Sequence, residues 1–384
     1  MRRPLAVWFA VILSVIGGVA AVQAQTGAAG SFESVGSLHE GRFAHTATLL
    51  QDGRVVVIGG FSFLGALSST EFYDPASSMI SAGESLAVAR QFHTASRLPD
   101  GRVLVAGGMG SSFDPIDRIE VIDPAGGSTT EPGSTVEPRM YHTATRLPDG
   151  GVHFIGGFGA GLATTASTEI WEHKSGESQA AASLATDRGA HTSTLLPDGR
   201  ILVVGGGHGG LFSGEVVPTA EIHDPNTGRF TEAGSLPRAR GGHSATLLDD
   251  GRVLIVGGSA VDLDAGEASV FDSAFVWDPE SKTFQSAGAL AQGRSSHTAT
   301  LLPDGRVLVI GGTEGMTEAD VLAGAEIWDP STASFEPAGM LAAARSQHTA
   351  TLQPDGTVLV VGGLGTSGPA DPHSLVEVWS PTDT

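Results

Sequence analysis

The sequence predicts an all-β chain, a seven-bladed β-propeller of four-stranded blades whose last blade is closed by the N-terminal strand. Three observations lead to this fold class. One hairpin pattern occurs seven times, with 48 to 54 residues between equivalent histidines, and self-similarity at a fixed period indicates a repeat architecture. Each repeat offers four short strand-like runs separated by turn residues. The fourth run is missing from the last repeat and is found instead near the start of the chain.

The first two strands of each repeat form a hairpin, as residues 294–312 illustrate. The turn Pro303-Asp304-Gly305 presets φ with proline, offers a carboxylate to the following backbone, and places glycine where φ is positive. The second strand, for example residues 55–58, is apolar on both faces, which predicts a strand between two neighbouring sheets. A Gly-Gly pair ends it and indicates either a close backbone approach or a bulge.

The third strand follows a loop of variable length and usually ends before a proline, which removes a ladder donor. One position of this strand is occupied by tryptophan in four repeats and by Tyr73, Ile122 and His223 in the others, and we expect a large residue there to cover the face of the next blade. The tryptophans are Trp171, Trp277, Trp328 and Trp379.

The fourth strand shows how the ring closes. Residues 283–288 and 334–339 share a Phe and an Ala-Gly ending, and residues 31–36 carry the matching Ser-Phe-Glu-Ser-Val-Gly. The last repeat stops after its third strand, so the N-terminal strand is expected to complete it. Radial closure leaves only short, protected edges. We therefore expect residues 25–384 to form one propeller domain.

Composition limits the function classes. The chain has 384 residues and a net charge of −21, which excludes non-specific binding to nucleic acid or to an anionic membrane face. Residues 1–24 resemble a secretory signal peptide: Arg2 and Arg3 precede an apolar run, and Val22 and Ala24 occupy the −3 and −1 positions. An uncleaved anchor is the alternative. Cysteine is absent, which excludes disulfides and thiolate metal sites. We expect an exported, monomeric protein without further membrane contact.

An Arg-x-x-His segment opens every repeat. Because it recurs in each blade, it marks the architecture more strongly than a site. We expect each Arg to pair with a Glu at the start of the third strand, and each His to bond backbone near the central channel. The structural repeat residues are Arg42 and His45, Arg90 and His93, Arg139 and His142, Arg188 and His191, Arg240 and His243, Arg294 and His297, and Arg345 and His348.

The Arg/His segments and the variable loops share one face of the ring, because strands one and three of a blade run parallel. Recognition sites usually lie on such loops. In the fifth repeat Phe275 replaces the Glu, so Arg240 or Arg294 is left without a carboxylate partner and is free to take a ligand carboxylate or phosphate. The candidate ligand-binding residues are Arg240, His243, Arg294 and His297.

Two further loops carry patterns that are also found in ligand sites. Asp262, Asp264 and Glu267 alternate along the longest loop, as calcium ligands do, but the full twelve-residue calcium-loop spacing is absent, so a solvated acidic loop is the preferred interpretation. Residues 205–210 lack the helix that phosphate-binding glycine loops require. We interpret them as a flexible turn with His208 exposed.

With its Gly-Gly pairs and downstream aromatics, the chain resembles kelch-repeat β-propellers, in particular bacterial exported kelch proteins and the propeller domain of galactose oxidase. The family's third-strand Tyr is mostly replaced by the Trp described above. The copper chemistry of galactose oxidase needs a Cys-linked Tyr, whereas this chain has only Tyr73 and Tyr141 and no Cys. The resemblance also implies an alternative, since some exported kelch propellers are mutarotases that use Arg, His and Glu.

The combined expectation is a non-enzymatic recognition or scaffold propeller that binds a protein segment or a carbohydrate on its Arg/His loop face. No cofactor is expected apart from the calcium alternative. The second hypothesis is an enzyme of the mutarotase type that processes sugar acids, with Arg240 and His243 holding the carboxylate while a loop Glu moves a proton.

Overall fold

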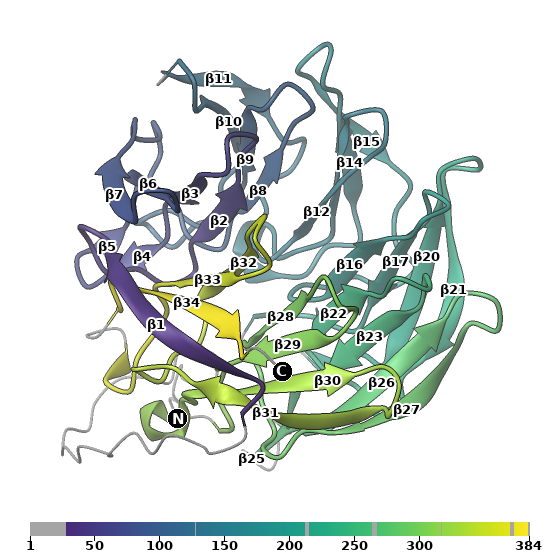
Figure 1. The fold of residues 1–384 in the computed structure, drawn as a ribbon. Coiled ribbons are helices and arrows are strands. Elements are labelled where there is room, and N and C mark those ends of the chain that lie inside the picture. The colour runs from purple at the N-terminus through teal and green to yellow at the C-terminus, as the bar shows by residue number, and fades with distance from the viewer. Residues whose placement is uncertain are drawn as a thin grey trace, which may run out of the picture.

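A computed structural model describes residues 28–126, 128–211, 215–262, 267–315, 317–368 and 372–382. The predicted signal peptide, residues 1–24, lies outside this range. Seven four-stranded antiparallel sheets are arranged as the blades of a ring (Figure 1). The innermost strands of neighbouring blades contact one another all the way round, so the predicted seven-bladed propeller is confirmed. Within the described part, no helix has the length and hydropathy to span a bilayer.

In each blade the first strand lies at the channel and the fourth strand lies at the outer rim. Blade 1 contains β2 (Thr46–Leu49), β3 (Val55–Ile58), β6 (Thr70–Asp74) and β7 (Met79–Ala82). Blade 2 contains β8 (Thr94–Arg97), β9 (Val103–Ala106), β10 (Arg118–Asp123) and β11 (Ser128–Ser134). Blade 3 contains β12 (Thr143–Arg146), β13 (Val152–Ile155), β14 (Thr168–Trp171) and β15 (Ser178–Ala181). Blade 4 contains β16 (Thr192–Leu195), β17 (Ile201–Val204), β20 (Thr219–Asp224) and β21 (Arg229–Ser235).

The other blades follow the same order. Blade 5 contains β22 (Ser244–Leu247), β23 (Val253–Val256), β26 (Ser273–Asp278) and β27 (Thr283–Ala289). Blade 6 contains β28 (Thr298–Leu301), β29 (Val307–Ile310), β30 (Gly324–Asp329) and β31 (Ser334–Met340). Blade 7 contains β32 (Thr349–Leu352), β33 (Val358–Val361), β34 (Leu375–Pro381) and β1 (Gly30–Ser37).

The loops between second and third strands carry small elements of their own. Three are two-stranded hairpins: β4 (Phe61–Ser62) with β5 (Gly65–Ala66), β18 (Gly207–His208) with β19 (Glu215–Val216), and β24 (Ser259–Asp262) with β25 (Glu267–Val270). Two are 3₁₀ turns, η1 (Ala160–Leu162) and η2 (Glu318–Asp320). We call the face formed by these loops and the Arg-x-x-His segments the loop face, and the opposite face the turn face.

The inner hairpins have the predicted turn chemistry. In blade 6, Asp304 Oδ1 accepts the backbone N–H of Arg306 at 3.0 Å, and Asp304 Oδ2 accepts the Nε–H of the same residue at 2.8 Å. Gly305 has φ +83°, a conformation that side-chain-bearing residues rarely adopt. The turn thus fixes the register in which the apolar second strand pairs with the first.

The second strands form the core. Each of their residues is buried in all seven blades, as expected for strands covered on both faces. The Gly-Gly pair that follows is required by a close backbone approach, as predicted. A Cβ on Gly60, which has φ +101°, would lie 2.7 Å from the carbonyl oxygen of Phe43.

The N-terminal strand closes the ring. β1 pairs antiparallel with β34, with Phe32 opposite Trp379 and Ser31 opposite Ser380. In Figure 1 the purple β1 lies beside the yellow strands of the C-terminal blade. This pairing gives blade 7 the same four strands as the other blades and joins the two ends of the chain in one sheet.

The tryptophans fill the interfaces between blades, but each packs against the preceding blade and not against the next one as expected. Trp277 of blade 5 packs in one cluster with Leu202 and Ala233 of blade 4, and its Nε1–H donates to the carbonyl oxygen of Ala233 at 2.9 Å. Trp328 and Trp379 donate in the same way to the preceding blade. The large residue therefore covers the preceding blade and not the next one. Its side chain lies on the face of the third strand that is turned toward the preceding blade.

One seam differs in chemistry. Between blades 3 and 4, His153 occupies the position of Leu202, and His223 occupies the position of the Trp. Their rings meet edge to face with centroids 4.7 Å apart, and both side chains are buried. Burial lowers the pKa of His153 to about 3, and it also lowers the pKa of His223. Both rings are therefore neutral at physiological pH.

Candidate functional site

A belt of backbone hydrogen bonds surrounds the channel at the loop face. The residue before each repeat histidine has φ between +49° and +61° and donates its N–H to the equivalent residue of the preceding blade. Seven such bonds, of 2.9 to 3.5 Å, close the circle. The belt residues are Ala44, Phe92, Tyr141, Ala190, Gly242, Ser296 and Gln347. The belt links all seven blades around the channel. Because its N–H groups are already bonded, they are not available as donors to a ligand.

The repeat histidines form a second ring beneath the belt. Each Nε2 lies 2.9 to 3.0 Å from a Thr or Ser hydroxyl of the preceding blade, a side-chain partner that the sequence did not indicate. His243, for example, contacts Thr192, and His297 contacts Ser244. Burial, followed by the Arg of the same segment, lowers the pKa of His243 to about 3. These histidines are neutral architectural groups.

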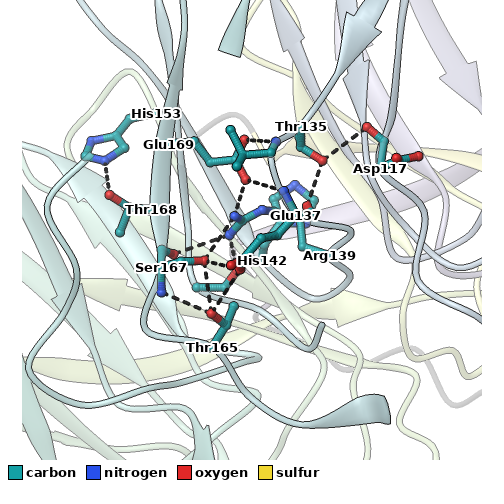
Figure 2. A network of polar contacts seen from close by, with 12 residues as sticks. Asp117, Thr135, Glu137, Arg139, His142, His153, Thr165, Ser167, Thr168 and Glu169 are labelled. Carbon is teal, nitrogen blue, oxygen red and sulfur yellow. Dashed lines mark hydrogen bonds and ion pairs between the residues drawn. The ribbon is translucent and has the colours of Figure 1, made fainter. Parts of the chain in front are cut away.

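The predicted Arg–Glu pairs are present in six blades. Figure 2 shows one of them, in which Arg139 contacts Glu169. Arg139 also donates to the carbonyl oxygen of Gly156 at 2.7 Å. The same carboxylate accepts the backbone N–H of Val136 at 2.6 Å and of Glu137 at 3.2 Å. Such additional hydrogen bonds offset the cost of burying the two charges, although Nε of Arg139 is buried without a partner. The pairs are Arg42–Glu71, Arg90–Glu120, Arg139–Glu169, Arg188–Glu221, Arg294–Glu326 and Arg345–Glu377.

Blade 5 is the exception that the sequence indicated. Among the described residues Arg240 has no carboxylate partner, and its guanidinium lies 4.7 Å and 5.1 Å from the ring centroids of Phe271 and Phe275. It donates to the carbonyl oxygens of Gly257 and Ser273 at 2.6 and 3.2 Å. Burial, then repulsion by Arg238, lowers the pKa of Arg240 to about 10.

A second substitution accompanies the lost carboxylate. In the other blades the Glu accepts the N–H of the residue three before the Arg, such as Ala185 before Arg188 at 2.7 Å. In blade 5 that residue is Pro237, which has no N–H. The donor and the acceptor are thus absent together, so neither is left unsatisfied.

The four candidate ligand-binding residues therefore lie below the loop surface. Arg240 is 0% exposed and Arg294 is 1% exposed, and Arg294 is held by Glu326 at 2.5 Å. The hypothesis that Arg294 is unpartnered is wrong. Arg240 lacks a carboxylate, but two phenyl rings cover it. His243 and His297 are buried as well, so ligand contact at this face falls to the loops above them.

An apolar patch stands on the loops of blades 1 and 2. Phe63 and Leu64, at the tip of the β4–β5 hairpin, are 71% and 86% exposed. Phe113, in the next loop, is 48% exposed, and its ring centroid lies 6.3 Å from that of Phe61. We define Phe61, Phe63, Leu64 and Phe113 as the apolar patch. The sequence carried a signal for it, because the run Phe-Ser-Phe-Leu is unusually apolar for a surface loop.

A pair of unlike groups meets on the loops of blades 3 and 4. His208 Nδ1 lies 2.8 Å from Asp187 Oδ1, and Thr164 donates its hydroxyl to the other oxygen of that carboxylate. Hydrogen bonds and His208 outweigh partial burial and hold the pKa of Asp187 below its usual value. His208 is exposed as predicted, but it belongs to β18 and is not part of a turn. Sequence reasoning missed the pair because its members lie 21 residues apart, on different loops.

The proposed calcium ligands are only partly within the described residues. Asp264 lies outside them, and Asp262 and Glu267 are described by backbone alone, facing one another at the end of the β24–β25 hairpin. Elsewhere in the described chain no three His, Asp or Glu side chains form a group suited to a metal ion. Calcium binding stays a prediction, which calcium-dependent melting of wild type and Asp264→Ala would test.

The fold and this face define a seven-bladed β-propeller with variable loops on one face of a rigid ring. No protein-family model matches the chain. It is 33% identical to Kelch-like protein 34 of Homo sapiens over 113 residues, which is 29% of this chain and 17% of that protein's length. The chain is a kelch-type propeller.

Two solved structures share the fold. One is a fungal alcohol oxidase of the AA5 family in complex with copper, with a TM-score of 0.71 and 19% identity over 94% of this chain and 76% of that chain. The other is YjhT, with a TM-score of 0.62 and 13% identity over 79% of this chain and 99% of that chain. At these identities the likeness concerns the fold alone.

The residues of this chain do not fit a copper-radical centre. The chain has no cysteine, Tyr73 is buried in β6 within a seam cluster, and Tyr141 belongs to the belt, stacked on Phe92 at 4.1 Å. Burial raises the pKa of Tyr141, which disfavours the phenolate that a metal would need. We therefore derive no copper chemistry for this protein.

Proposed function

We propose that this chain is an exported, non-enzymatic recognition module whose loop face binds an extended apolar segment of a protein partner. The apolar patch carries the proposal. Its three exposed members project from adjacent loops, and soluble proteins rarely leave such side chains grouped at the surface without a binding role. The repeat Arg and His side chains of the same face are buried in the ring, which leaves the loops as the binding elements.

The chemistry of the patch favours a protein segment over a carbohydrate. Sugars are held by aromatic faces together with polar donors, whereas Leu64 offers neither a ring nor a donor. Burying Phe63 and Leu64 would contribute about 1.5–3 kcal/mol each, against association costs of several kcal/mol. The expected affinity is therefore modest. Asp114 and Asp117 share the loop of Phe113 and are exposed, so basic residues flanking the apolar anchors would add steering.

Selection from a peptide display library on the purified mature chain tests this proposal. We expect apolar peptides with basic flanks, bound at least tenfold more weakly by the variant Phe63→Ser/Leu64→Ser, since two anchors contribute most of the energy. Met79→Ser is the matched control, because Met79 is 65% exposed in the same blade but follows a turn of the turn face. Equal peptide binding by the double variant, or binding of glycans in place of peptides, would refute the proposal.

A sugar-acid-processing enzyme is the second candidate, and the Asp187–His208 pair favours it. A carboxylate that holds Nδ1 of a half-exposed imidazole leaves Nε2 available for proton transfer. Turnover of carboxylated sugars that is lost in His208→Gln, and kept in Phe63→Ser/Leu64→Ser, would establish this candidate. Turnover that is absent from wild type, or unchanged in His208→Gln, would remove it.

A further inference from the structure

A cavity of about 560 Å³ lies on the turn face where blades 4 and 5 meet. Arg200, Asp224 and Arg229 of blade 4 line it, and Lys282 reaches it from the β26–β27 turn of blade 5. The cavity is therefore on the opposite face of the ring from the apolar patch. Its volume falls in the range of small-molecule sites.

The lining is positive in a strongly negative protein. Three cations and one carboxylate border the cavity, whereas the whole chain carries −21. Arg200 is held by Asp198 at 2.7 Å. Within the described chain, Arg229 and Lys282 make no ion pair, so their charges are available to a ligand.

Both available cations are exceptions to the repeat. Arg229 begins the fourth strand of its blade, opposite Asp224, and no other blade has a basic residue at that position. The equivalent residues are Met79, Ser128, Glu177, Thr283, Ser334 and Ser31. Lys282, one of the two lysines in the chain, is likewise the only basic residue immediately before a fourth strand. The other six blades form the same sheet without a basic residue at these positions, so the fold does not require Arg229 or Lys282.

We propose that this cavity binds a tetrahedral oxyanion, the phosphate or sulfate group of a small ester. A guanidinium and an ammonium supply several N–H donors, and Thr231 adds an exposed hydroxyl; oxyanions with three acceptor oxygens match such a donor set. The cavity exceeds the size of the ion itself, which leaves room for a sugar-sized group. Asp224 Oδ1 already accepts the N–H of Asn226 at 2.8 Å and a side-chain N–H of the same residue at 3.1 Å, so we assign a ligand hydroxyl to the second oxygen of that carboxylate.

Calorimetric titration of the mature chain with inorganic phosphate, inorganic sulfate, a sugar phosphate and a sulfated disaccharide tests the proposal. We expect saturable binding of one ester class, stronger than binding of its inorganic ion, and weaker at physiological than at low ionic strength. Arg229→Ser and Lys282→Ser should each weaken it about tenfold. The preferred ester identifies the source of the oxyanion.

Arg306→Ser is the matched control, because Arg306 lies on the turn face, carries the same charge and is paired with Asp304 at 2.7 Å outside the cavity. Its affinity should equal that of wild type, and circular dichroism melting verifies that each variant folds. Unchanged affinity in Arg229→Ser and Lys282→Ser, equal weakening by Arg306→Ser, or no binding to wild type would overturn the proposal. Phe63→Ser/Leu64→Ser should bind the ester as wild type does, so the ester site and the proposed peptide site are tested independently of each other.

Discussion

Mild acid should unfold this propeller through its ring of seven buried histidines. In the folded state their pKa values lie at about 3 for His93, His191, His243 and His348, and well below 6.5 for the others. Burial is the main cause in each case, because no acidic partner offsets the cost of a buried imidazolium. In the unfolded chain the same groups titrate near 6.5.

The sign and size of the effect follow by linkage. Below pH 6.5 these histidines become protonated in the unfolded state and stay neutral in the folded state. The free energy of unfolding therefore falls as pH falls. The loss starts at about pH 6.5 and continues to the folded pKa values. Between pH 7 and pH 5.5 it amounts to about 1.3 kcal/mol for each histidine and about 9 kcal/mol for seven. Domains are typically stable by about 5–15 kcal/mol, so most of the margin disappears.

Urea denaturation followed by circular dichroism at several pH values between 5 and 7.5 measures this loss. His243→Gln keeps an N–H able to reach Thr192 and removes one titrating group, so its loss between pH 7 and pH 5.5 should be smaller by about 1.3 kcal/mol. Thr192→Val is the control, because it removes the hydroxyl partner and leaves all seven imidazoles. A free energy of unfolding that stays level between pH 7 and pH 5.5 would refute the reasoning.

Three further predictions concern stability and are measured by the same urea method. Gly60→Ala should cost at least about 2 kcal/mol more than Gly53→Ala, because both positions have positive φ but nothing lies within 4 Å of a Cβ on Gly53; equal costs would contradict the close approach. Arg188→Met should cost about 3–5 kcal/mol by stranding a buried carboxylate, and Arg240→Met about 1–3 kcal/mol by stranding only carbonyl oxygens; the reverse order would count against the pairing. His153→Leu should stabilise the protein by about 1.4 kcal/mol more at pH 5.5 than at pH 7.5, and a gain independent of pH would show that this imidazole is charged in the folded state.

The repeat pattern allowed the blades to be predicted because each blade obeys local rules. Turn residues such as Gly305 and the apolar second strands determine register within a blade, and the N-terminal run beginning at Ser31 matched the missing strand. The direction of the Trp packing was predicted wrongly. Whether Trp277 covers the preceding or the following blade depends on which face of its sheet is turned toward the preceding blade. The pattern of a single repeat does not determine this.

The site was harder to predict than the fold, because its groups come from loops and turns that are separated in the sequence. The sequence indicated the Arg–Glu pairs and the gap at Phe275, since both recur at fixed spacing. It gave no indication that Phe271 covers Arg240, that Asp187 meets His208, or that Lys282 joins Arg229. These contacts join loops or turns whose lengths vary from blade to blade, so their partners depend on three-dimensional placement.

Hydrogen exchange of the mature chain with and without a selected peptide tests most directly whether the loop face is the recognition surface. The proposal predicts slower exchange in residues 61–66 and 109–117, the loops that carry the apolar patch, and no change in the turns of the opposite face. Slower exchange confined to the turn face, or none at all at saturating peptide, would contradict it.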